Sequence, residues 1–129
     1  MNPISGKVST GCVGELLVQI RLLQYGVQAA PPIEDSGNDL IAVNGQAFRA
    51  VSVRTTTTGT YNKPDIARVY HVLAVVHLRG EDRSLFLDQS DLYLIPQEEV
   101  ADASTRCEHL GAYRFSREQV QLLFGQLAD

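Results

Sequence analysis

The pair Asn44-Gly45 is the sequence feature that most limits the folds this chain can adopt, because Asn-Gly is the strongest short signal for a β-hairpin. The stretch Asp39 to Val43 precedes the pair and Gln46 to Thr56 follows it, and both have strand character. In a hairpin centred on this pair the numbers of matched residues sum to about 89, which places Asp39 near Ala50 and diagonal to Ser52. The sequence therefore predicts two antiparallel strands, the first of which starts with an acid.

Helical spacing appears near both ends of the chain. Near the N-terminus, apolar residues repeat at helical spacing and predict a helix over roughly residues 10–25. Ser9 or Thr10 is its expected N-cap, and Gly26 is expected to end it. Ser116 predicts the N-cap of a final amphipathic helix over about 116–128. A short helix is expected after Pro96.

The stretch Arg68 to Leu78 is apolar on both faces, which predicts a central strand covered on both sides. Further short strands are expected at Ser84 to Leu87, Leu92 to Ile95 and Tyr113 to Phe115. This order of elements predicts an α/β (α+β) fold, a central mixed and mostly antiparallel sheet flanked by helices. We expect one domain over residues 1–129, with its core in about 10–100.

The charge is distributed unevenly along the chain. The net charge is -4 and the pI is near 5.3, which argues against a general nucleic-acid coat protein. Residues 40–80 nevertheless carry a net charge of +4, from Arg49, Arg54, Lys63, Arg68 and Arg79 against Asp65. Two interpretations stay open, a segment that contacts phosphates and an ordinary solvated surface.

Composition and termini indicate a cytoplasmic protein. No apolar run is long enough to span a membrane, and the first residues lack the pattern of a signal peptide. Cys12 and Cys107 lie far apart in the sequence, so we expect both to be reduced structural thiols.

Several polar residues are expected to converge beside Asp39. Ser52 and Arg54 are two positions apart on one strand, so they share a face, and the hairpin brings Asp39 toward them. Glu15 on the first helix could approach the same edge. Two carboxylates there could hold Mg²⁺, a hard cation that prefers oxygen ligands.

The order "GE…SGNDLIAVNGQAFRAVSVRT…HVLAVVHL…LYLIPQEEV" resembles the PD-(D/E)XK, or restriction-endonuclease-like, superfamily, especially its small Holliday-junction-resolvase-like members. The resemblance covers roughly residues 10–100. It implies that Glu15 matches the helix glutamate and Asp39 the first metal ligand. Ser52 and Arg54 then occupy the positions of the second ligand and the lysine. It also implies Mg²⁺ or Mn²⁺ as cofactor, DNA as partner and pairing into a homodimer.

The motif departs from the family pattern at two positions. A serine hydroxyl is a poorer Mg²⁺ ligand than a carboxylate, although Glu15 or Glu34 could supply the missing one. Arg54 keeps a positive charge and can bind a phosphate, but it cannot act as a base. The first hypothesis is a nuclease-like protein with metal-dependent phosphodiester hydrolysis on DNA, with Arg49, Lys63 and Arg68 as further nucleic-acid contacts. The alternatives are an inactive nuclease-fold module that binds nucleic acid or protein, and an unrelated α+β interaction domain.

Other polar residues have plainer interpretations. Asp39 could simply accept hydrogen bonds from loop N–H groups. The threonines 55–58 suit an edge strand through their β-propensity. His71 and His77 are expected to be half-buried, hydrogen-bonded residues at the two ends of the central strand, because no third ligand lies at a useful spacing. The spacing of Cys12, Cys107 and His109 is not a zinc signature.

Overall fold

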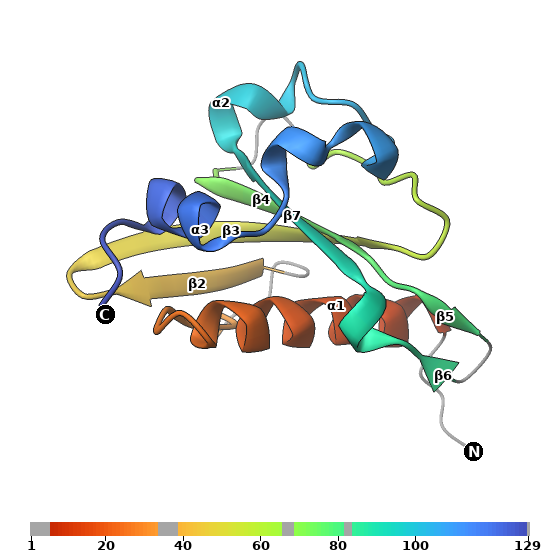
Figure 1. Ribbon diagram of the computed structural model, residues 1–129, viewed down its shortest axis with the longest axis horizontal. Coiled ribbons are helices and arrows are strands. Elements are labelled where there is room, and N and C mark those ends of the chain that lie inside the picture. The colour runs from red at the N-terminus through yellow and green to blue at the C-terminus, as the bar shows by residue number, and fades with distance from the viewer. Residues whose placement is uncertain (1–5, 34–38, 66–68, 82–83, 129) are drawn as a thin grey trace.

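The computed structural model describes residues 6–33, 39–65, 69–81 and 84–128, with side chains from Thr10 onward in the first helix and from Leu40 onward in the second strand. A mixed β-sheet forms the middle layer (Figure 1). Helix α1 (Gly6–Leu23) runs along one face, and α2 (Gln97–Val100) lies on the opposite side. No helix in these ranges has the length and apolar character needed to cross a membrane.

The sheet has five strands in the order β1-β2-β3-β4-β7. Their bounds are Gln28–Ala30 for β1, Asp39–Asn44 for β2, Ala47–Thr56 for β3, Val72–His77 for β4 and Asp91–Pro96 for β7. The β3–β4 pair is parallel and the other pairs are antiparallel. A separate two-stranded ribbon joins β5 (Gly80–Glu81) to β6 (Ser84–Leu85). This mixed, mostly antiparallel sheet between helices confirms the predicted fold class.

Strand β4 is the centre of the molecule, because all six of its residues are buried. Its alternate side chains enter two hydrophobic cores. Val72, Ala74 and Val76 pack with α1 and with α3 (Arg117–Phe124). Leu73 and Val75 pack on the other face with residues of α2 and of the segment that follows it. The prediction of a doubly covered strand is confirmed, although residues 69–71 lie outside the strand.

The helix ends follow local chemistry only in part. Gly26, with a φ of 80°, reverses the chain after α1, and its N–H donates to the Leu23 carbonyl at 2.9 Å. Ser116 caps α3 as predicted, because its Oγ accepts from the Gln119 N–H at 3.0 Å. Ser9 and Thr10 are not caps, since α1 already begins at Gly6. The expected strand at 113–115 is wrong, since a 3-10 turn, η3 (Gly111–Tyr113), occupies part of it and only Arg114 forms a bridge.

The β2–β3 hairpin is shifted from its expected register. Asn44 stays in β2 and pairs with Ala47, so that Gly45, with a φ of 62°, and Gln46 form the turn. The Asn44 side chain donates to the carbonyls of Phe124 and Gln126 at 2.9 and 3.0 Å. These bonds satisfy carbonyls at the C-terminus of α3, which explains why Asn44 is not a turn residue.

Helix α1 touches β3 at Gly14. A Cβ built on Gly14 would lie 1.8 Å from the Oγ1 of Thr55 and 2.9 Å from its Cβ. Any larger residue would therefore push the helix away from the sheet. Glycine inside a helix costs up to about 1 kcal/mol of stability relative to alanine. At this position the glycine weakens the helix but allows α1 to pack closely against β3.

We expect Gly14→Ala to destabilise the protein by about 1–3 kcal/mol, because overpacking outweighs the gain in helix propensity. Urea unfolding would measure the loss. Adding Thr55→Ala should recover part of it by removing the Oγ1 and Cγ2 atoms that clash.

Gly111→Ala is the matched control, since a Cβ there meets nothing within 4 Å. Its effect should stay below about 0.5 kcal/mol. A Gly14→Ala protein as stable as the wild type would show that the helix does not pack this closely.

Candidate functional site

The hairpin register places three of the predicted site residues on one face of the sheet. Asp39 lies directly opposite Ser52, whereas the sequence had placed it opposite Ala50. Ser52 pairs with Leu73 on its other side, and Arg54 pairs with Val75, so both follow the face of the α2 core. The backbone thus brings Asp39, Ser52 and Arg54 to one face. The side chain of Asp39 lies outside the described part of the structure.

Strand β3 extends beyond the start of β2. Residues 53–56 pair with β4 on one side, while the β2 ladder stops at Asp39 and Ser52 on the other. The close packing at Gly14 brings the first half of α1 to this end of β3. A cleft of about 570 Å³ lies there, lined by Thr10, Gly11, Arg54, Thr55, Thr56, Thr57, Thr58 and Asn62. Its lining is rich in hydroxyl groups and contains one guanidinium.

Three buried polar atoms at this end of β3 have no hydrogen-bond partner within the described ranges. They are the Oγ of Ser52, the Nε of Arg54 and the Oγ1 of Thr55. Ser52 is only 1% exposed. Buried polar atoms are nearly always paired, and an unpaired one costs about 1–3 kcal/mol. The three atoms do not form one cluster, because the Thr55 Oγ1 lies against Gly14 on the α1 side, whereas Ser52 and Arg54 follow the opposite face. Arg54 lines the cleft, so its Nε is the donor for which a ligand there could supply the missing partner.

Thr56 organises the loop that borders the cleft. Its Oγ1 donates to the Thr60 carbonyl at 2.8 Å and accepts from the N–H groups of Thr58 and Gly59 at 3.1 and 3.2 Å. The sequence favoured an edge strand for the threonines 55–58. Thr55 and Thr56 do end a strand with one unpaired side, since within the described ranges they pair with β4 alone, whereas Thr57 and Thr58 begin a turn that the Thr56 hydroxyl closes. The run of threonines before a glycine was the available signal for this turn.

Arg54 acts electrostatically on its neighbour Tyr70. Burial raises the pKa of the Tyr70 phenol, and the positive charge of Arg54 partly opposes that rise. Arg54 therefore lies close enough for its charge to stabilise an anion beside it. Sequence reasoning missed Tyr70, since it was expected to be one residue of a longer central strand.

Glu15 lies on α1 and is not among the residues that line the cleft. It lies one helical turn after Gly11, so the two residues share a side of the helix. Glu15 is half-buried. No group of three or more histidine, cysteine, aspartate or glutamate side chains gathers at one point within the described ranges.

The other predicted nucleic-acid contacts do not gather around Arg54. Arg49 pairs with Ala42, a residue of the α1–α3 core, so it lies on the opposite face of the sheet. Lys63 donates through Nζ to the Ala101 carbonyl at 2.9 Å and ties its loop to the end of α2. Arg68 and Glu34 fall outside the described residues. The basic segment is therefore divided between the two sides of the sheet.

The two histidines differ from each other. His71 is exposed and precedes β4, and its Nδ1 accepts the Ala50 N–H at 2.9 Å. His77 is buried at the end of β4. Burial, followed by the charge of Arg79, lowers the pKa of His77, so its imidazole is neutral at pH 7. His71 is hydrogen-bonded as expected, although neither histidine is half-buried and only His77 lies within the strand.

Cys107 is a buried free thiol and Cys12 is an exposed one. Burial raises the pKa of the Cys107 thiol, which keeps it protonated.

Exposed apolar residues lie on two helices. On α3, Leu122 faces outward while Val120 and Phe124 are buried. On α1, Leu16, Ile20 and Leu23 are exposed beside the edge strand β1. Pairing of two copies stays a prediction.

The fold has a counterpart among solved structures. The structure of a bacterial homing endonuclease, I-Ssp6803I, superposes with a TM-score of 0.59 over 85% of this chain and 86% of that one, at 17% sequence identity. This similarity shows that the chain shares the fold of that endonuclease. No protein-family model and no curated protein sequence matches the chain.

Proposed function

We propose that this chain binds DNA at the end of β3, with Arg54 contacting a backbone phosphate in the threonine-lined cleft. The observation that carries the proposal is the Nε of Arg54 at that cleft, a buried donor that has no partner among the residues the structure describes. A guanidinium can donate two parallel hydrogen bonds to a phosphate, and threonine hydroxyls are common donors to phosphate oxygens. The fold shared with a homing endonuclease supports DNA as the ligand.

We further propose that Asp39 and Glu15, with the Ser52 hydroxyl, hold Mg²⁺ or Mn²⁺ at this site. All three groups offer oxygen, which a hard cation prefers, and the Ser52 Oγ is a buried oxygen that has no partner within the described ranges. Glu15 would have to join them around the end of β3, since α1 covers the opposite face of the sheet. A divalent ion bound there would activate water for phosphodiester hydrolysis. Arg54 would orient the phosphate and neutralise charge on it, since a guanidinium stays protonated and cannot take a proton from water.

Binding without hydrolysis is the second candidate. It is favoured by Ser52 itself, which places a neutral hydroxyl, 1% exposed, directly opposite Asp39. A site with two carboxylates binds a divalent cation more weakly than one with three, because ligand charge contributes strongly to affinity. The chain would then be an inactive nuclease-fold module.

We expect Arg54→Gln to weaken DNA binding by roughly 10- to 100-fold, because the contact is a charge-assisted hydrogen bond of about 1.5–3 kcal/mol. Fluorescence anisotropy with a labelled duplex at low salt would measure the change. Arg49→Gln is the matched control, since it removes the same charge from the opposite face of the sheet. Equal losses in the two variants would contradict a site at Arg54.

We expect DNA cleavage in Mg²⁺ or Mn²⁺ that disappears in Asp39→Ala. A panel of single-stranded, duplex and branched DNA, analysed on denaturing gels, would detect it. Ser52→Asp should strengthen cleavage by adding a third carboxylate. Binding that depends on Arg54, with no cleavage by the wild type in either metal, would favour the inactive module.

A further inference from the structure

A second polar pocket adjoins the cleft across the Thr56–Thr60 loop. Its volume is about 250 Å³, and Thr58 borders both spaces. The pocket lies between His77 at the end of β4, with Arg79 two residues after it, and the turn that carries Arg106 and Cys107. A strand that leaves the cleft over Thr58 would therefore meet this pocket next.

Backbone hydrogen bonds build one wall of the pocket. The Cys107 N–H donates to the Gly59 carbonyl at 2.8 Å, and the Tyr61 N–H donates to the Thr105 carbonyl at 3.0 Å. Gly59 packs against His77, because a Cβ on Gly59 would lie 3.2 Å from the imidazole Cε1. The loop and the turn thus form one short ladder that holds Arg106 in place.

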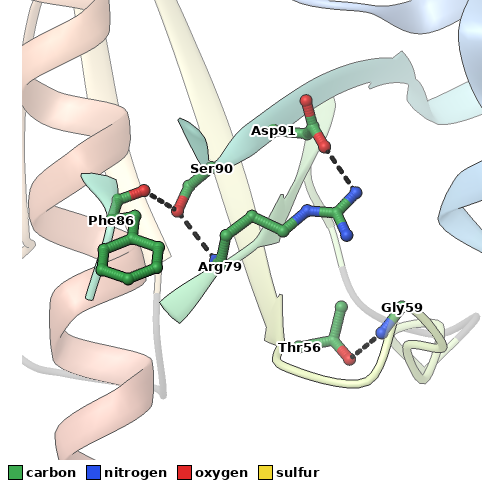
Figure 2. Close-up of polar contacts among 6 residues, drawn as sticks. All are labelled: Thr56, Gly59, Arg79, Phe86, Ser90 and Asp91. Carbon is green, nitrogen blue, oxygen red and sulfur yellow. Dashed lines mark hydrogen bonds and ion pairs between the residues drawn. The ribbon is translucent and has the colours of Figure 1, made fainter. Parts of the chain in front are cut away.

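Hydrogen bonds also hold the opposite wall of the pocket, as Figure 2 shows. The Arg79 N–H donates to the Ser90 Oγ at 2.9 Å, and that hydroxyl donates to the Phe86 carbonyl at 3.0 Å. The Arg79 side chain extends from this anchor toward Asp91, on the side where the Thr56–Gly59 turn lies. The anchor fixes the backbone and leaves the guanidinium at the rim of the pocket.

The two guanidinium groups are only partly engaged. Nη2 of Arg79 pairs with Oδ2 of Asp91 at 2.9 Å, and Nη2 of Arg106 pairs with Oε1 of Glu108. The Arg79 side chain is 48% exposed and the Arg106 side chain 61% exposed. Exposed ion pairs of this kind contribute at most about 1 kcal/mol, so a phosphate can compete for the remaining N–H groups. The hydroxyls of Thr58 and Thr60 line the same space.

We propose that this pocket binds a second phosphate of the nucleic-acid strand whose first phosphate lies at Arg54, held between Arg79 and Arg106 from its two walls. The inference rests on the proposed function, since it extends the same strand past the Thr56–Thr60 loop. The phosphate of a free nucleotide has the same chemistry, so the test has to separate the two sources.

The first arm uses inorganic phosphate alone. Titration of the ¹⁵N-labelled protein should shift the amide signals of Gly59 and Thr60 and the Arg106 Nε signal in a saturable way. Arg106→Gln should abolish the amide shifts, and Arg117→Gln, an exposed arginine on α3, should leave them unchanged. Absence of a saturable shift, or a shift that survives Arg106→Gln, would overturn the pocket as a phosphate site.

The second arm measures binding of a labelled single-stranded oligonucleotide against salt. Each phosphate contact contributes about 0.7 to the slope of log K against log salt, so Arg106→Gln should lower that slope by about 0.7. DNA binding that depends on Arg54 and keeps its full slope in Arg79→Gln and Arg106→Gln would overturn the inference and leave the proposed function standing.

The remaining outcomes separate the sources. A chain that binds no DNA but shows the Arg106-dependent phosphate shift would overturn both the proposed function and the strand path, and would leave the pocket as a site for free phosphate or nucleotide. A mononucleotide that binds as tightly as the oligonucleotide would overturn the strand path and assign the pocket to free nucleotides.

Discussion

The close contact between α1 and β3 at Gly14 and Thr55 is the constraint on which the site depends. Without a Cβ at position 14 the helix lies directly against the last residues of β3. That approach makes Thr10 and Gly11 one wall of the cleft and Arg54 to Thr58 the other. The β2 ladder stops at Asp39, opposite Ser52, so β3 continues beyond β2 to reach this contact. One glycine thus joins a helix and a strand end into a single site.

The sheet separates the polar residues of this site from the main hydrophobic core. Val51 and Val53 face α1, whereas Ser52 and Arg54 face the smaller core. Alternation along β3 therefore places a hydroxyl and a guanidinium where burial leaves them without partners in the described ranges. Such unpaired groups lower the stability of the folded chain, and a ligand that completed their hydrogen bonds would restore it. The threonine turn closed by Thr56 then links this site to the pocket at Arg79 and Arg106.

Local sequence patterns predicted the elements well. The apolar run to Leu78, the Asn44-Gly45 pair and the Ser116 cap each depend on neighbouring residues, and each predicts the element that forms there. Tertiary contacts decided the rest. The hairpin register depends on Asn44 bonding to the end of α3, 80 residues away in sequence. The separation of Arg49 from Arg54 follows from alternation on β3, but the face of the sheet that α1 covers is decided by tertiary packing and not by neighbouring residues in the sequence.

Mapping a bound DNA duplex onto the ¹⁵N-labelled protein tests the central claim most directly, because it locates the ligand without requiring cleavage. If DNA binds at Arg54, the largest amide shifts fall on Gly11 and on residues 54–58, with smaller ones on the face of the sheet that carries Ser52. Shifts concentrated instead on the exposed side of α1 around Leu16 and Ile20, with residues 54–58 unchanged, would contradict that claim.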